Sequence, residues 1–229
     1  MPSGLSCLNN MQNRLVVVDS FFEDPDDIRK FALAQKYYPS ETGQWPGVRT
    51  SPLHAVNLAF NKYFVERLTK YIIGIHDQVK SIDIQAQFQI IRPLHDDPDS
   101  PLNRGMVHTD SIYSVEEGVL TPNVAGVVYL TPGAHPRCGT SLFDAVPGVE
   151  NPSLPFYIKS SLYKTGTVVP AYDTEIKKHF DSFTETARAC NKYNRLVAFD
   201  SAQWHSCNNF HTGISYPRLT LVFFAELKY

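Results

Sequence analysis

The hydrophobic pattern of the chain begins with helical spacing and changes to alternation after the first third. A β-branched run at 13–19 predicts a strand. Asp24, which precedes a proline, is typical of a helix start and predicts a helix over about 25–36. Apolar residues at helical spacing predict a second helix over 56–75. The turn-rich residues 38–54 predict an irregular segment between the two helices.

Alternation of apolar and polar residues begins at Ile82. In the stretch 82–92 the apolar residues alternate with aspartate and glutamine, which is typical of a strand with one buried face. Further strands are predicted at 106–111, 126–130, 139–143, 195–199 and 219–227. An insert at 146–194 has a helical pattern in its second half, over 174–193. Helices followed by many short strands predict a mainly β fold with flanking helices (α+β), in which a sandwich or barrel has helices packed on one side.

Composition narrows the class of protein. With 229 residues, 43% of them hydrophobic and 12% aromatic, the chain can bury a large core, and this excludes a disordered chain or a coiled coil. The net charge of −2, without a dense Lys/Arg run, argues against nucleic-acid binding. The longest apolar run, 219–227, is shorter than the roughly 20 residues that span a bilayer, so we expect no membrane segment.

The cysteines and the N-terminus indicate the compartment. The four cysteines are Cys7, Cys138, Cys190 and Cys207. They lie far apart, without metal-binding spacing, in a chain too large to need disulfides. The N-terminus lacks the basic start and apolar stretch of a secretory signal. We therefore expect free thiols in a reducing cytoplasm.

The sequence contains three His-x-Asp pairs, a spacing that turns two side chains to the same face of a strand. The pairs are His95 and Asp97, His108 and Asp110, and His179 and Asp181. The third pair falls in a helical pattern, where such side chains diverge, so we expect it on the solvated surface. The first pair lies in a proline-bracketed acidic turn that we expect to face solvent, although such a turn could border a site. The middle pair lies in a predicted strand and has suitable geometry for two ligands of one metal ion.

His205, which follows the predicted strand 195–199, supplies a third ligand. Two histidines and one carboxylate hold Fe(II) on one face and leave positions open for a co-substrate and O2. Arg218 and Thr220 open the last strand two residues apart, so they share a face and could together hold a carboxylate. His211 is a nearby alternative ligand, although the sequence after it is typical of a loop.

The order of these features resembles the 2-oxoglutarate/Fe(II)-dependent dioxygenases. Residues 13–33 look like the opening strand and helix of the prolyl-4-hydroxylase-like branch. Residues 126–130 and 138–143 are similar to that branch's tyrosine-leucine strand and Gly-Gly-x-x-x-Phe strand. Two features depart from the pattern, because the first of these glycines is Cys138 here and the insert at 146–194 has no counterpart.

The resemblance covers most of the chain and implies a fold and an activity. The fold is the double-stranded β-helix, with a jelly-roll, cupin-like core. We expect one domain over 1–229, in which a strand-helix support at about 13–80 packs on a core at about 82–229. The implied activity uses O2 and 2-oxoglutarate, releases succinate and CO2, and hydroxylates a peptidyl side chain of prolyl type or a small metabolite. The oligomeric state stays open, because the exposed edges of a β-helix can pair or be covered.

The resemblance also implies roles for individual residues. The implied iron ligands are His108, Asp110 and His205. Arg218 pairs with the distal carboxylate of 2-oxoglutarate, and Tyr129 and Thr220 support that carboxylate by hydrogen bonds. A buried arginine suits this role because it neutralises a dianion that is otherwise costly to bury.

Other residues are candidates for the mouth of the site. Arg49, Arg104 and Arg137 are candidate contacts for an anionic or polar substrate. Trp204, next to His205, is either a packing residue over the iron or a further substrate contact. Two alternatives remain open: a cupin-like metalloenzyme that does not use 2-oxoglutarate, and a non-catalytic β-barrel binding module. Neither alternative accounts for Arg218.

Overall fold

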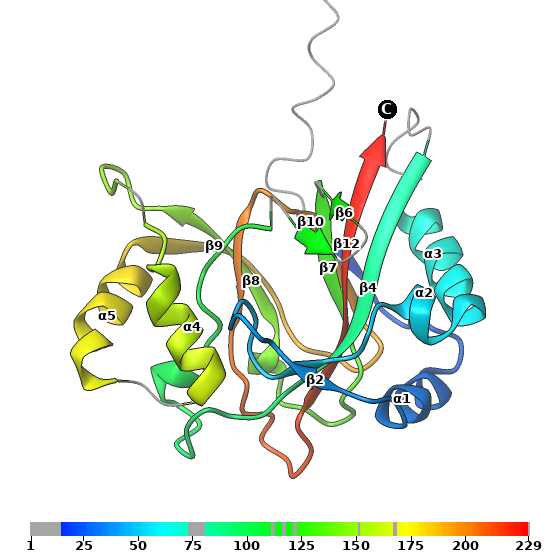
Figure 1. The fold of residues 1–229 in the computed structure, drawn as a ribbon, viewed down its shortest axis with the longest axis horizontal. Coiled ribbons are helices and arrows are strands. Elements are labelled where there is room, and N and C mark those ends of the chain that lie inside the picture. Colours follow the sequence, from blue (N-terminus) through cyan, green and yellow to red (C-terminus); the bar gives the residue numbers. More distant parts are fainter. Residues whose placement is uncertain are drawn as a thin grey trace, which may run out of the picture.

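The fold is mainly antiparallel β-structure with helices on two sides (Figure 1). The computed structural model describes residues 15–72, 81–110, 113–115, 118–120, 123–150, 152–166 and 169–228. The predicted mainly β class with flanking helices is confirmed. Expectations for Cys7, for residues 13–14 and for residues 73–75 lie outside the described residues.

Two sheets make up the body of the protein. In spatial order, the seven strands of the larger sheet are β1 (Leu15–Val18), β10 (Leu196–Asp200), β7 (Val124–Tyr129), β12 (Arg218–Lys228), β4 (Ser81–Ile91), β3 (Val48–Arg49) and β2 (Tyr38–Pro39). Those of the smaller sheet are β11 (Trp204–Cys207), β8 (Thr140–Ala145) and β9 (Phe183–Ala189). β5 (Tyr113–Val115) and β6 (Gly118–Leu120) pair with each other. All of these pairings are antiparallel.

The N-terminal helices cover one face of the larger sheet. They are α1 (Pro25–Leu33), α2 (Leu53–Val56) and α3 (Leu58–Ile72). The Asp24 carboxylate caps α1 by accepting the Asp27 N–H at 3.2 Å. A helix-side core fills the space below them, and its aromatic members include Phe21, Phe64, Phe88 and Phe223. α1 ends three residues earlier than predicted, and the segment predicted to be irregular contains the short strands β2 and β3.

Strand β12 lies between two interiors. It pairs with β4 on one side and β7 on the other, and both of its faces are buried. Leu219, Leu221 and Phe223 enter the helix-side core. Arg218 and Thr220 have the opposite parity and therefore point toward the smaller sheet. The alternation predicted for 82–92 is confirmed in β4, where Ile82, Ile84 and Ile90 pack against the helix-side core.

A second core joins the two sheets. Its members include Tyr129 from β7, Leu142 from β8, Val197 and Phe199 from β10, and Phe224 from β12. Since these residues come from both sheets, the sheets pack face to face. Gly139, at the start of β8, allows a close approach, because a Cβ there would lie 1.9 Å from the Ala189 carbonyl oxygen.

The insert carries the helices on the far side of the smaller sheet, at the left of Figure 1. They are α4 (Phe156–Thr165), the 3-10 turn η5 (Pro170–Tyr172) and α5 (Asp173–Asp181). The helix predicted over 174–193 is wrong beyond Asp181. From Phe183 the chain pairs with β8 as strand β9, so strand pairing outweighs the local helical pattern.

Further short elements complete the description. Two 3-10 turns, η3 (Pro101–Asn103) and η4 (Pro136–Cys138), lie in the loops. The strand predicted at 106–111 is reduced to an isolated bridge between His108 and His205. None of the helices in the part of the chain that the structure describes has the length and apolar character needed to cross a membrane. Cys138, Cys190 and Cys207 are free thiols, as expected.

Candidate metal centre

The backbone brings the three predicted ligands together. His108 and His205 exchange two backbone hydrogen bonds, with N–O distances of 3.0 and 2.9 Å. Residues that face each other in this way in an antiparallel bridge project their side chains to the same side. The Asp110 N–H donates to the Ser201 carbonyl at 2.8 Å and fixes the carboxylate beside the two rings. His108, Asp110 and His205 form a group whose ligand atoms lie within 4.8 Å of one another.

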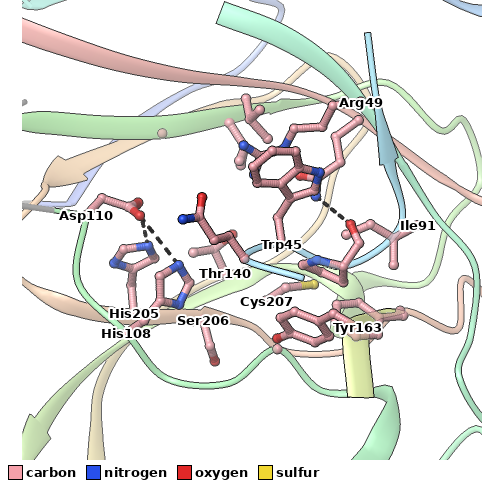
Figure 2. A pocket seen from close by; sticks show the side chains of 18 of the residues that line it. Trp45, Arg49, Ile91, His108, Asp110, Thr140, Tyr163, His205, Ser206 and Cys207 are labelled. Carbon is pink, nitrogen blue, oxygen red and sulfur yellow. Dashed lines mark hydrogen bonds and ion pairs between the residues drawn. The ribbon is translucent and has the colours of Figure 1, made fainter. Parts of the chain in front are cut away.

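Both imidazoles present the nitrogen that a metal needs. The Asp110 carboxylate lies 3.6 Å from His108 Nε2 and 3.0 Å from His205 Nε2 (Figure 2). His108 Nδ1 is 2.8 Å from the Met106 carbonyl, and His205 Nδ1 is 2.9 Å from the Gln203 carbonyl. A carbonyl only accepts, so each Nδ1 carries the proton and each Nε2 lone pair is free for a cation.

The charges of the group suit a divalent metal. Burial opposes ionisation of Asp110, but the positive charges that His205 and His108 carry when protonated, and the hydrogen bond that protonated His205 donates, hold its pKa well below the usual range. Burial, with smaller effects from His205 and Lys159, lowers the pKa of His108. The set offers two imidazole nitrogens and one carboxylate, which are the ligands of Fe(II) in facial triads.

The insert holds the segment that carries His108. The Met106 N–H donates to the Tyr163 hydroxyl at 3.0 Å, and the Val107 N–H donates to His179 Nε2 at 3.0 Å. His179 Nδ1 lies 2.9 Å from the Pro152 carbonyl, and the residue is only 3% exposed. The expectation that His179 is a solvated surface residue is wrong. It is a buried positioning residue, whereas Asp181 is exposed and pairs with Lys177.

A cavity of about 420 Å³ opens beside the three ligands. In Figure 2 the three candidate ligands lie at the left of the view, Trp45 lies near its centre and Arg49 lies at the upper right. Its walls come from the larger sheet, from β11, from residues 44–49 and from α4. This cavity is where a co-substrate and a substrate could reach a bound metal.

Arg218 enters this cavity from β12. It is 3% exposed, its Nε donates to the Cys138 carbonyl at 3.2 Å, and its guanidinium lies 5.5 Å from the centre of the Tyr129 ring. Among the residues that the structure describes, no carboxylate forms an ion pair with it. Burying a charge without a partner is costly, so this arrangement is typical of a binding site for an anion.

The other two predicted co-substrate residues lie behind the cavity wall. Tyr129 and Thr220 are fully buried and are not in contact with the cavity. The Tyr129 hydroxyl donates to Thr140 Oγ1 at 2.8 Å, and Thr140 does line the cavity. Thr220 Oγ1 has no hydrogen-bond partner within the described ranges. Thr140 therefore offers a positioned hydroxyl beside Arg218, which sequence reasoning missed.

The candidate mouth residues are placed in different surroundings. Arg49 lines the main cavity, 4.6 Å from the centre of the Trp45 ring. Arg104 packs on Phe180, and Arg137 pairs with Asp99; neither lines this cavity. Trp204 lines a smaller cavity of about 210 Å³, on the other side of the His108 segment.

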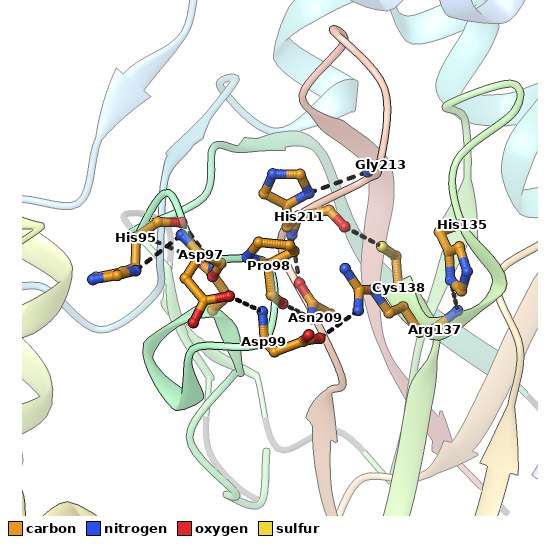
Figure 3. A network of polar contacts seen from close by, with 11 residues as sticks. His95, Asp97, Pro98, Asp99, His135, Arg137, Cys138, Asn209, His211 and Gly213 are labelled. Atoms are coloured by element: carbon orange, nitrogen blue, oxygen red, sulfur yellow. Dashed lines mark hydrogen bonds and ion pairs between the residues drawn. The ribbon is translucent and has the colours of Figure 1, made fainter.

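The remaining histidine candidates lie in a separate polar network (Figure 3). His95 is exposed, and its Nδ1 accepts the Asp97 N–H at 3.0 Å. His211 Nδ1 accepts the Gly213 N–H at 3.3 Å. These residues line neither cavity, so the structure brings neither histidine to the metal ligands.

Lys159, Trp45 and Gln89 also line the main cavity, and sequence reasoning missed them. Lys159 lies in the insert, where one lysine among several carries no signal of its own. Trp45 lies in a turn-rich segment without periodicity. Gln89 belongs to the polar face of a predicted strand, and only the covering sheet reveals that this face is buried.

Comparison with known proteins provides a family and a fold. A model of DUF6445, described as a family of unknown function, matches residues 5–215. Comparison with curated proteins gave no match.

Several solved structures share the fold. HygX from Streptomyces hygroscopicus, with nickel and 2-oxoglutarate bound, is 14% identical, with a TM-score of 0.53 over 92% of this chain and 82% of that chain. An oxidoreductase of the 2OG-Fe(II) oxygenase family from Burkholderia pseudomallei is 12% identical, with a TM-score of 0.54 over 93% and 85%. AviO1 from Streptomyces viridochromogenes Tue57 is 15% identical, with a TM-score of 0.50 over 94% and 91%. At these identities the likeness concerns the fold.

Proposed function

We propose that this chain, which belongs to the DUF6445 family, is an Fe(II)- and 2-oxoglutarate-dependent oxygenase. The two facing sheets are then the halves of a double-stranded β-helix, in one domain that carries the insert. Two of the solved structures that share the fold support this proposal. HygX has nickel and 2-oxoglutarate bound, and the Burkholderia pseudomallei protein is described as a 2OG-Fe(II) oxygenase.

One observation carries the proposal: three candidate metal ligands share one cavity with a buried arginine that forms no ion pair with any described residue. His108, Asp110 and His205 fit Fe(II) by donor type and by the orientation of their Nε2 lone pairs. Arg218 fits a carboxylate because a guanidinium fork binds one through two parallel hydrogen bonds. A structural metal site has no need of this arginine, and a cupin-like enzyme without a dianionic co-substrate has none either.

The side chains of the cavity have separate tasks. When bound, iron and 2-oxoglutarate supply the oxidation of a C–H bond by O2, with release of succinate and CO2. His108, Asp110 and His205 would hold the metal at one side of the cavity. Arg218 and Thr140 would hold the distal carboxylate of the co-substrate, with Tyr129 and Thr220 supporting them from behind. The aromatic walls, including Phe199 and Phe224, exclude water from the reaction.

The test is an anaerobic titration of the purified protein with Fe(II) and 2-oxoglutarate. We expect the weak visible charge-transfer band of the chelated co-substrate, followed by slow succinate release when air is admitted. His108→Ala and Asp110→Ala should abolish both the band and iron binding. His95→Ala, in the exposed His-x-Asp pair, is the matched control and should leave both unchanged. Near-normal iron binding in both ligand variants would show that the site is assigned wrongly.

The finer assignments belong to the same proposal. We propose a hydroxylation, of a peptidyl side chain in the manner of the prolyl-4-hydroxylase-like branch or of a small metabolite. The cavity of about 420 Å³ is large enough for 2-oxoglutarate and part of a small substrate, which favours the metabolite. Product analysis with candidate substrates separates these two possibilities.

A further inference from the structure

The cavity beside the candidate metal centre carries more positive charge than the proposed reaction uses. Its lining includes three cationic side chains, Arg49, Lys159 and Arg218, and a single acidic one, Asp110. In the proposed reaction Arg218 pairs with one of the two carboxylates of 2-oxoglutarate, so its charge is balanced. The metal, the three cations, Asp110 and the two carboxylates together still leave two net positive charges. Arg49 and Lys159 are the two cations of the described lining to which the proposed reaction assigns no role.

Lys159 is the more informative of the two cations. It is half-buried on α4, and its ammonium lies 5.9 Å from the centre of the Tyr163 ring. Among the described residues it forms no ion pair and no hydrogen bond. Burial lowers its pKa, while the charge of Asp110 acts in the opposite direction. A lysine kept near the metal ligands without a partner is costly unless a ligand compensates it.

Arg49 reaches the same space from the larger sheet. Its guanidinium lies between aromatic rings, 4.6 Å from the centre of Trp45 and 5.8 Å from that of Phe224. These cation–π contacts position the guanidinium at the wall of the cavity. Arg49, Asp110 and Lys159 all line the same cavity.

The insert fixes the position of Lys159 relative to Arg49. The neighbouring Ser160 hydroxyl donates to the Thr42 carbonyl at 2.6 Å. A Cβ on Gly43 would lie 2.7 Å from Ser160, so the loop and the helix are in close contact. This contact joins α4 to the loop that leads into β3, so the two cations come from two walls that are held together.

We infer that Arg49 and Lys159 together bind a carboxylate or phosphate group of the substrate, which makes the substrate a small organic anion. This inference rests on the proposed function, and it assigns the insert a role in substrate selection. The aromatic side chains that line the same cavity, among them Tyr163 and Phe199, then contact the apolar part of the substrate.

The test uses a matched pair of probes, 4-(trifluoromethyl)phenylacetate and its uncharged primary amide. Binding to the Ni(II)- and 2-oxoglutarate-loaded protein is followed by fluorine NMR of the probes. We expect the acid to bind about tenfold more tightly than the amide, since a charge-assisted contact typically contributes this much or more. Lys159→Gln and Arg49→Gln should each reduce that preference to about threefold or less.

Two controls separate the possible failures. Lys164→Gln, at an exposed position of the same helix, should keep the full preference for the acid. The affinity for 2-oxoglutarate should be unchanged in Lys159→Gln and Arg49→Gln. Equal binding of the two probes to the parent protein, including no binding of either, overturns the inference, and so does a loss of 2-oxoglutarate affinity in Arg49→Gln. Loss of the charge-transfer band in the parent protein instead refutes the proposed function, whatever the probes do.

Discussion

Replacement of Arg218 by methionine tests whether this side chain serves a ligand or the fold. The change removes one charged hydrogen bond, to the Cys138 carbonyl at 3.2 Å, and one cation–π contact with Tyr129. These contribute about 2–3 kcal/mol together. The change also removes a buried, unpaired charge, whose desolvation costs several kcal/mol. We therefore expect the free energy of unfolding of the ligand-free variant to lie within about 1 kcal/mol of that of the parent protein, or to be higher.

The response to 2-oxoglutarate should change in the opposite sense. At 100 times its dissociation constant, a ligand raises the free energy of unfolding by about 2.7 kcal/mol. Loss of a buried charge partner weakens binding by about 2–5 kcal/mol. At the same ligand concentration, the metal-loaded variant should therefore gain less than about 1 kcal/mol.

Urea unfolding with and without 2-oxoglutarate measures both quantities. Arg67→Met is a matched control, because Arg67 donates to the Phe21 carbonyl and pairs with Glu23, each at 2.7 Å. This variant should lose about 1–3 kcal/mol of stability and keep its response to the ligand. If Arg218→Met loses 3 kcal/mol or more and still responds fully to 2-oxoglutarate, Arg218 is a structural residue and the argument from its missing partner is refuted.

Two further predictions concern stability. The Asp19 carboxylate accepts hydrogen bonds from Arg195, and these lower the pKa of Asp19. The ionised carboxylate therefore stabilises the folded protein above the unfolded-state pKa of about 3.9, and this contribution is lost as the pH falls below that value. Because the pair is partly exposed, Asp19→Asn should cost only about 1 kcal/mol at pH 7, and urea unfolding at pH 3 should show a smaller difference. Tyr163→Phe leaves the buried Met106 N–H without its acceptor, so it should lower the free energy of unfolding by about 1–3 kcal/mol and weaken metal binding. The control Tyr157→Phe, at an exposed position, should change neither the stability in urea nor the metal affinity.

The sequence predicted the elements whose signals are local. The alternation in β4 and the capped start of α1 depend on neighbouring residues, and both were found where expected. The segment 183–189 was predicted to be helical because its local pattern suits a helix. Its strand conformation depends on pairing with β8, which lies far away in the sequence.

The candidate site was predictable to the same degree. The candidate ligands His108 and Asp110 carry a spacing signal, and the structure brings His205 beside them. His179 carries a similar spacing, but its burial depends on how the insert packs against Val107. Lys159 has no pattern at all, because its role arises only when α4 reaches the cavity.

The two faces of strand β12 should differ in the substitutions that they accept. Its odd-numbered positions build the helix-side core, and even-numbered positions such as Arg218 border or support the cavity. Substitutions at even positions can therefore reshape the cavity while the helix-side packing stays intact. Deletion of a single residue in β12 would instead exchange the two faces and place the Arg218 charge among the phenylalanines. Laboratory evolution of new specificity should accept substitutions at cavity-lining even positions such as Val222 and Phe224, and almost never accept a change in the length of the strand.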